Sequence, residues 1–140
     1  MAEIRIIKPH QREAEAASGA MSRLAGVSAS LVGAQGIYMA IATIPPGCRS
    51  GAHWHTNCES AIYILRGHGR FLVGEDLGTA LEFGPGDFLY VPPEALHQPV
   101  NDGTDAVEMV VARNTPVELV REYPGSTARR SSPRRPSAGR

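Results

Sequence analysis

Residues 51–60 read GAHWHTNCES and place four candidate metal ligands, His53, His55, Cys58 and Glu59, within ten positions. His53 and His55 are separated by one residue, so on an extended strand both imidazoles point to the same side and Trp54 points to the other. A His-x-His pair on a strand favours a metal site over two unrelated histidines. For Trp54 we expect ordinary packing on the opposite face.

The position of Glu59 relative to these histidines is not fixed by spacing alone. On a single uninterrupted strand Glu59 would share the face of His55, whereas Cys58 would not. The intervening Thr56-Asn57 pair has the composition of a turn or bulge, so the alternation cannot be carried across it. Glu59 is the best carboxylate candidate, provided that a bulge turns its side chain toward the histidines.

The two cysteines offer an alternative ligand set. Cys48, His53, His55 and Cys58 could form a structural zinc knuckle, but tetrahedral Cys₂His₂ sites usually have tighter paired spacings. We rank this alternative low and expect both cysteines to be inert, at least partly buried thiols.

A second cluster follows in GPGDFLYVPPEALHQPVN, residues 84–101. A glycine- and proline-containing turn leads into the apolar segment Phe88–Val91, the Pro92-Pro93 pair ends that strand, and His97 follows a short loop. His97 alone is a weak signal. His97 becomes a stronger ligand candidate if both clusters lie in one antiparallel sheet system, because it would then be matched with the histidine pair across the strands.

Along the whole chain, glycine and proline residues separate short segments, as is typical of an all-β protein. Its 15 glycines and 11 prolines recur between short β-prone segments, a spacing typical of a sandwich or barrel. Only Gln11–Ala17 has helical composition, and it is too short to be stable unless packed. The predicted strands are Ile4–Ile7, Ile37–Ile44, His53–His55, Ala61–Arg66, Arg70–Val73, Ala80–Phe83, Phe88–Val91, Gln98–Asn101, Val107–Arg113 and Val117–Val120.

Composition divides the 140 residues into three parts. We expect an N-terminal arm packed on the barrel (1–36), the β-barrel itself (37–123) and a disordered Arg/Ser/Pro-rich tail (124–140). The tail holds five arginines, no acid and no aromatic residue to stack on bases, so we expect no nucleic-acid partner. With no signal peptide and no membrane-length apolar run, we expect a cytoplasmic protein without a membrane partner.

The two clusters together resemble the cupin superfamily. Its first motif, G-x5-H-x-H-x3–4-E-x6-G, is matched by residues in order with one additional position before the final glycine: Gly47, His53, His55, Glu59 and Gly67. Its second motif, G-x5-P-x-G-x2-H-x3-N, is matched by Gly86, Pro92, His97 and Asn101. Eighteen residues separate the motifs, and the resemblance covers about residues 37–113. The local sequence around the two motifs is most similar to that of single-domain bacterial cupins of the RmlC-like or mannose-6-phosphate-isomerase-like type.

The resemblance implies a jelly-roll β-barrel with one divalent transition metal near its open mouth. The ligands that it implies are His53, His55, Glu59 and His97. Such a set suits Fe, Mn, Zn, Ni or Cu and leaves one or two coordination positions for water or a small-molecule substrate. A homodimer is also expected from the resemblance alone.

Two departures from the motifs bear on the site. Counted back from Gly67, Ser60 rather than Glu59 occupies the usual glutamate position, so a three-histidine site is the fallback. Glu94 stands where the second motif usually has glycine. It is a weak candidate for an acid or base at the barrel mouth, because carboxylates on loops are mostly solvated.

Two functions fit these features. The favoured one is a metal-dependent enzyme that acts on a small organic substrate, either by Lewis-acid chemistry of the isomerase, epimerase or cyclase type or as a dioxygenase. The alternative is a non-catalytic cupin module that binds or senses a small molecule. The chain contains no nucleophile elbow, no phosphate-binding loop and no complete dinucleotide fingerprint.

Overall fold

Twelve strands and two short helical turns make up the computed structural model, which describes residues 2–124. The helical turns are the 3-10 helix Pro9–Gln11 and α1 (Ala29–Val32). The strands, in chain order, are β1 (Glu13–Glu15), β2 (Ser22–Val27), β3 (Tyr38–Ile44), β4 (Cys48–Arg49), β5 (His53–His55), β6 (Ser60–Arg66), β7 (Gly69–Val73), β8 (Thr79–Phe83), β9 (Phe88–Val91), β10 (His97–Asn101), β11 (Val107–Arg113) and β12 (Val120–Glu122).

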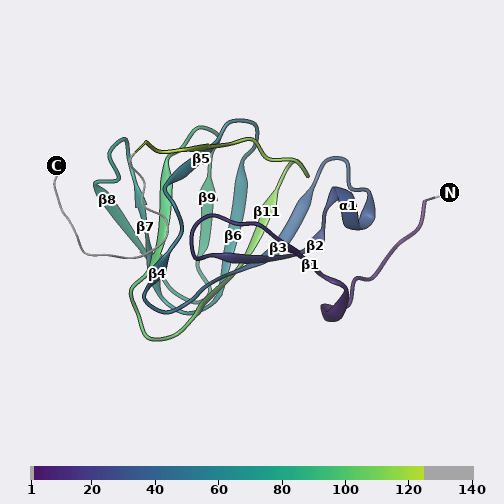
Figure 1. Cartoon of the computed structure of the whole chain (residues 1–140), viewed down its shortest axis with the longest axis horizontal. Coiled ribbons are helices and arrows are strands. Elements are labelled where there is room, and N and C mark those ends of the chain that lie inside the picture. The colour runs from purple at the N-terminus through teal and green to yellow at the C-terminus, as the bar shows by residue number, and fades with distance from the viewer. Residues whose placement is uncertain (1, 125–140) are drawn as a thin grey trace.

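These strands form two antiparallel sheets that face each other (Figure 1). One sheet has the order β1-β2-β3-β11-β6-β9, and the other has the order β12-β5-β10-β7-β8 with β4 paired to β10. The chain alternates between the sheets along β5, β6 and β7 and again from β8 to β12. This is the all-β jelly-roll architecture that the sequence predicts, and it brings the two histidine clusters onto neighbouring strands of one sheet.

The core lies between the two sheets and follows the two-residue alternation of the strands. In β6, Ser60, Ile62 and Ile64 face inward and are buried, whereas Ala61 and Leu65 are exposed. Burying an aliphatic side chain of this kind stabilises the fold by about 1.5–3 kcal/mol. The buried cluster consists of Ala42, Ile44, Ile62, Ile64, Phe71, Phe83, Val91, Val107 and Met109.

Within residues 37–113 the predicted strands agree with the structure to within one residue at each end. Two predictions outside that range are wrong or shifted. Ile4–Ile7 forms no strand: the chain leaves the barrel as an extended arm at this point (Figure 1). The predicted strand Val117–Val120 overlaps β12 only at Val120.

The segment Gln11–Ala17, which has helical composition, forms the strand β1 at its centre. This strand pairs with β2 in the register Glu13↔Ala25 to Glu15↔Arg23, and β2 in turn pairs with β3. A segment of this length is too short to hold a helix in isolation, so pairing with a neighbouring strand decides its conformation. The N-terminal part thus extends one sheet of the barrel, and its β1–β2 connection lies over the interior.

Residues 2–124 contain no helix that is long and apolar enough to cross a membrane. The predicted tail 124–140 lies, apart from Pro124, outside the described residues.

Candidate metal centre

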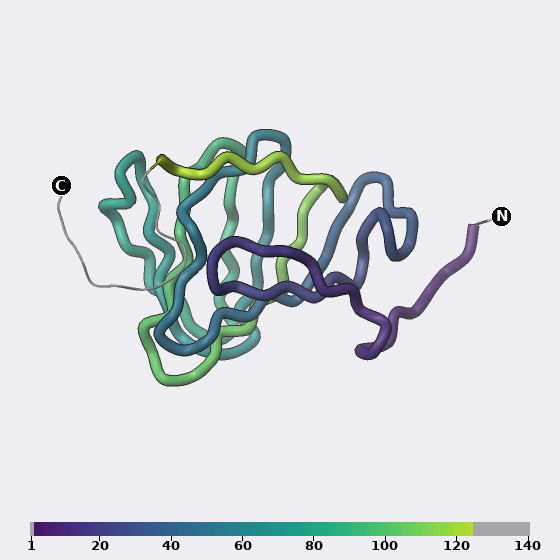
Figure 2. The backbone as a smooth tube through the Cα atoms, viewed as in Figure 1, coloured from purple at the N-terminus to yellow at the C-terminus, as the bar shows by residue number. Residues whose placement is uncertain are grey.

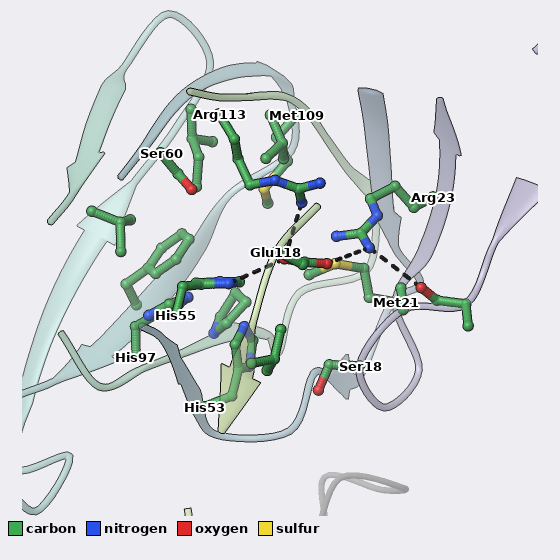
Figure 3. Close-up of a pocket in the computed structure, with 18 of the residues that line it drawn as sticks. Ser18, Met21, Arg23, His53, His55, Ser60, His97, Met109, Arg113 and Glu118 are labelled. Carbon is green, nitrogen blue, oxygen red and sulfur yellow. Dashed lines mark hydrogen bonds and ion pairs between the residues drawn. The ribbon is translucent and has the colours of Figure 1, made fainter. Parts of the chain in front are cut away.

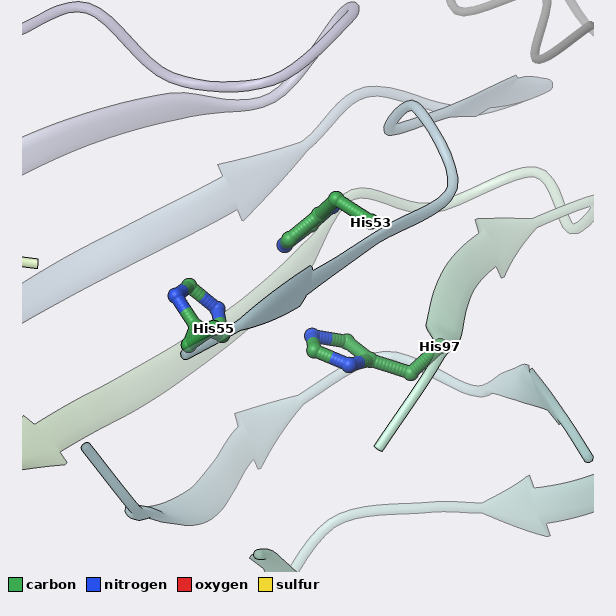
Figure 4. A group of neighbouring side chains, drawn as sticks. All are labelled: His53, His55 and His97. Carbon is green, nitrogen blue, oxygen red and sulfur yellow. The ribbon is translucent and has the colours of Figure 1, made fainter. Parts of the chain in front are cut away.

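Three histidines converge at the inner surface of the β5–β10 sheet. His53 and His55 lie on β5 and face the interior, and His97 is the first residue of β10, in register with His53. One ring nitrogen from each lies within 4.8 Å of those of the other two (Figure 4). All three side chains are buried, with 6–8% of each residue exposed. The short β5–β10 pairing therefore creates a compact group of three imidazoles.

An oxygen atom lies close to the Nδ1 atom of each ring, in a hydrogen bond for His53 and His97 and at ion-pair distance for His55. His53 Nδ1 lies 2.8 Å from the carbonyl oxygen of Gly51, and His97 Nδ1 lies 2.8 Å from that of Ala95. His55 Nδ1 lies 3.1 Å from Oε1 of Glu118. Acceptors at Nδ1 favour the tautomer that carries its proton there and leaves the Nε2 lone pair free to bind a metal. The three residues thus fit a divalent transition metal ion.

Burial favours the neutral form of His53 and His97. It lowers the pKa of His97 to about 3, with the neighbouring His53 adding to the effect. Burial also lowers the pKa of His53, although the contact with the Gly51 carbonyl opposes the shift. Since only a neutral imidazole can donate a lone pair to a metal, both rings are in the ligating form at neutral pH.

The histidines line a partly open cavity of about 240 Å³ between the two sheets (Figure 3). Its lining has a charged part and an apolar part, so the cavity suits a small organic molecule with a polar end. The charged part includes Arg23, Arg113 and Glu118 beside the histidines. The apolar part, called the apolar wall, comprises Ile62, Phe71, Val91, Met109 and Val111.

Glu118 links the histidine cluster to two arginines. Its Oε1 lies 3.0 Å from a guanidinium nitrogen of Arg113, and its Oε2 accepts a hydrogen bond of 2.9 Å from Arg23 (Figure 3). Burial alone would raise the pKa of Glu118, but the contact with His55 and the charges of Arg113 and Arg23 outweigh it and lower the pKa to about 2. Glu118 is therefore a carboxylate at neutral pH.

The sequence gives no indication of a role for Glu118. It lies 63 residues beyond His55 in a short segment between β11 and β12, and no motif spacing connects the two. The pairing of β12 with β5, which sets Val120 opposite His55, and the hydrogen bonds of Thr56 and Asn57 to residues 117–119 bring this segment to the cluster.

The structure does not bring Glu59 to the histidines. Its side chain is exposed and accepts a hydrogen bond of 2.8 Å from the hydroxyl of Tyr90. The extra residue of the first motif is accommodated at the other end of β6, where the register against β11 shifts at Leu65. No bulge therefore turns Glu59 inward, and the inward position is taken by Ser60, which lines the cavity.

The cysteines also lie apart from the histidine group. Neither Cys48 nor Cys58 belongs to it, and both are free thiols. Cys58 is buried, and burial raises the pKa of its thiol, which disfavours the thiolate needed for metal binding. The zinc-knuckle alternative thus finds no support in the geometry.

Trp54 and Glu94 lie on the far side of the sheet and its loops. Trp54 is half-buried and turned away from the histidines, as the alternation along β5 predicts. Glu94 is exposed in the β9–β10 loop, where its backbone N–H donates to the carbonyl of His55. Both residues line a second, more open cleft of about 730 Å³ rather than the cavity of the histidine cluster.

Two facing antiparallel sheets with three inward histidines define a small β-barrel with a candidate metal site. Residues 40–113 match the Cupin_2 family, the cupin domain, which is more than half of the chain. The protein belongs to the cupin family. A comparison with curated proteins finds no match.

Solved structures of low identity share the fold. The polyketide cyclase RemF from Streptomyces resistomycificus is 19% identical, with a TM-score of 0.73 over 86% of this chain and 85% of that one. An uncharacterized conserved protein from Klebsiella pneumoniae with a double-stranded beta-helix domain is 15% identical, with a TM-score of 0.65 over 77% and 88%.

The oxalate decarboxylase of Lactobacillus farciminis, solved as a formate complex, is 23% identical, with a TM-score of 0.68. That match covers 81% of this chain but only 34% of the decarboxylase, so this chain spans about a third of that enzyme. At these identities the likeness establishes the fold.

Proposed function

We propose that this cupin binds one divalent transition metal through His53, His55 and His97 and uses it to act on a small organic molecule in the adjoining cavity. The observation that carries the proposal is the shared arrangement of the rings: each Nδ1 faces an oxygen, and one ring nitrogen of each lies within 4.8 Å of the others. Three imidazoles leave coordination positions for water or substrate.

The cavity supports Lewis-acid chemistry of the isomerase, epimerase or cyclase type as the leading reaction class. A bound metal would polarise a carbonyl or enolate oxygen of the substrate. The arginines Arg23 and Arg113 place positive charge beside the same space, which favours a substrate end that carries negative charge. The apolar wall would exclude water and hold the carbon skeleton of the substrate.

Similar structures support an enzymatic role without fixing the reaction. One is named as a polyketide cyclase and others as oxalate decarboxylases, and the decarboxylase of Bacillus subtilis is described with Mn(II) centres. With redox-active iron or copper, the same ligands would favour dioxygenase chemistry instead.

The second candidate is a non-catalytic module that binds a small molecule. It is favoured by the state of Glu118, which contacts two arginines and whose pKa is lowered to about 2. Such a carboxylate is a weak base and carries no proton to donate at neutral pH.

The metal proposal is tested by elemental analysis of protein purified without chelator. We expect about one transition metal ion per chain in the wild type, and loss of the metal in His53→Ala and His97→Ala because each change removes one of three ligands. Glu59→Gln, Cys48→Ser and Cys58→Ser serve as matched controls and should keep the full metal content. Unchanged metal in both histidine variants would refute the site, and loss in a cysteine variant would restore the zinc knuckle.

Oxygen consumption over a panel of small organic acids and carbonyl compounds then separates the reaction classes. Iron with oxygen uptake would select the dioxygenase. Zinc, nickel or manganese with substrate turnover and no oxygen uptake would select Lewis-acid chemistry. A wild-type protein without stoichiometric metal would favour the binding module.

A further inference from the structure

We propose that Glu118 is a positioning residue that fixes the ring of His55, and that a segment C-terminal to the family-matched region supplies it. The inference deepens the proposed function, since it concerns the same metal centre. It assigns a role to residues 114–122, which lie beyond the matched residues 40–113.

His55 differs from the other two histidines in what holds its ring. The Nδ1 atoms of His53 and His97 face main-chain carbonyls within two residues of their own positions. His55 Nδ1 faces a side chain instead, at 3.1 Å from Oε1 of Glu118. The orientation of two rings is therefore set by the local backbone, whereas that of His55 depends on a distant part of the chain.

The backbone on both sides of Glu118 is held firmly. Asn57 donates from Nδ2 to the carbonyl of Val117 at 2.7 Å and accepts from the N–H of Leu119 at 2.8 Å. The N–H of Thr56 donates to the carbonyl of Leu119 at 2.9 Å. Residues 117–119 are thus clamped by the two residues that follow His55, and Glu118 between them is aimed at the cavity.

This segment crosses one end of the barrel strands (Figure 2). It begins after β11 and ends in β12, which pairs with β5 so that Val120 lies opposite His55 and Glu122 opposite His53. The same strand that carries two of the histidines therefore also carries the segment that positions one of them.

Two arginines contact the Glu118 carboxylate, one at each oxygen. Oε1 is shared between His55 and Arg113, while Oε2 accepts from Arg23 on β2. The guanidinium of Arg113 is itself fixed by stacking 3.6 Å over the ring of Tyr38. Because Arg113 shares Oε1 with His55, it holds this oxygen beside Nδ1 of His55, whereas Arg23 engages the other oxygen. Partners of this kind outside the ligand set orient a metal-binding imidazole and raise its basicity.

The first test is the tautomer of His55 in the metal-free protein, read from long-range ¹H–¹⁵N NMR of the histidine side chains. In the wild type we expect His55 to carry its proton on Nδ1. The variant Glu118→Asp keeps the negative charge for both arginines but withdraws the oxygen by one methylene, so we expect the His55 signals to move to the Nε2–H form or to a mixture. His53 and His97 should keep their Nδ1–H signals, since their acceptors are unchanged.

Arg23→Met is the matched control for the ion pair. It removes the partner of Oε2 and leaves the contact between Oε1 and His55 in place, so the tautomer of His55 should persist. If Glu118→Asp does not fold, the charge-neutral double variant Glu118→Leu with Arg23→Met replaces it, and the same change in the His55 signals is expected. Unchanged His55 signals in the folded Glu118 variant would overturn the inference.

The second test uses Co²⁺ as the probe, because its visible spectrum reports the geometry of the ligands. We expect Glu118→Asp to weaken Co²⁺ binding by about 10-fold or more and to change the spectrum of the bound ion. Arg23→Met and the surface variant Glu108→Gln, which breaks the ion pair with Arg66, should retain the wild-type affinity and spectrum. Equal losses in Glu118→Asp and Arg23→Met would show that Glu118 has only a structural role and would overturn the inference.

The two proposals fail in different ways. A wild-type protein that binds neither Co²⁺ nor a native metal refutes the proposed function, whatever the NMR shows. A wild type that binds metal, together with a Glu118→Asp variant that matches it in tautomer, affinity and spectrum, refutes only the role of Glu118.

Discussion

At the scale of single residues, the spacing of residues in the sequence predicts the orientation of the site histidines better than that of the carboxylates. His53 and His55 face one side because a strand alternates every two residues, and this rule needs no knowledge of the rest of the fold. Glu59 depends on where β6 absorbs one extra residue, and the shift falls at Leu65 instead. Glu118 depends on a pairing between distant segments, so no local pattern could have identified it.

Glu94 gives a prediction at this scale, because its φ of 70° lies in the left-handed region. This conformation costs a residue with a Cβ about 1–2 kcal/mol, whereas glycine adopts it freely. Glycine also loses more backbone entropy on folding, which offsets about 0.5–1 kcal/mol of the gain. We therefore expect Glu94→Gly to raise the free energy of unfolding by about 0.5–1 kcal/mol in urea denaturation.

Glu94→Ala is the control for that prediction. Alanine removes the exposed carboxylate but keeps a Cβ, so it should give little or no stabilisation. If alanine stabilises as much as glycine, the charge of Glu94 rather than its backbone conformation is responsible.

At the scale of elements, the central strands are predictable because their composition and the turns between them agree. In β3 and β11, runs of alternating buried residues are bounded by glycine, proline or asparagine. The N-terminal elements are not predictable in this way. Glu13–Glu15 has a helical composition, and β2 reads SRLAGV without strong alternation, so both become strands only through pairing with β3.

The clamp that Asn57 forms on residues 117–119 gives a prediction at this scale. Asn57→Ala removes one donor and one acceptor to the backbone of that segment. Each such hydrogen bond contributes about 0.5–1.5 kcal/mol, so we expect a loss of about 1–3 kcal/mol in the free energy of unfolding. Hydrogen exchange should accelerate at the amide of Leu119 before it does so in β11.

Asn57→Asp separates the two bonds of the clamp. It keeps the acceptor for the N–H of Leu119 but places a carboxylate against the carbonyl of Val117. Its loss in the free energy of unfolding should be at least as large as that of Asn57→Ala. Exchange at Leu119 that stays at the wild-type rate in both variants would show that β12 alone holds the segment.

At the scale of the whole molecule, the sheets determine which predicted residues meet. The histidine motifs are far apart in sequence, and their contact follows from the pairing of β5 with β10. The expected homodimer stays a prediction. Ile4, Ile6 and Phe88 are more than 70% exposed, and sedimentation analysis of the full chain would decide whether a second copy covers them.

The buried histidines give the molecule a stability that depends on pH. The pKa of His97 is lowered to about 3 by burial, whereas an unfolded histidine titrates near 6.5. Between these values the unfolded state binds a proton that the folded state does not, so the free energy of unfolding falls as the pH decreases. The pKa of Glu118 is lowered to about 2, which acts in the same direction at still lower pH.

We therefore expect the metal-free protein to lose stability between pH 6.5 and pH 4, by an amount on the order of a few kcal/mol. Thermal unfolding measured across this range in the presence of a chelator checks the prediction. His97→Gln cannot take up that proton and should show a smaller decrease, whereas His10→Gln, which changes an exposed histidine, should follow the wild type. If His97→Gln and the wild type lose stability in parallel, the burial of His97 does not control the acid sensitivity of the barrel, and the other carboxylates and histidines account for it.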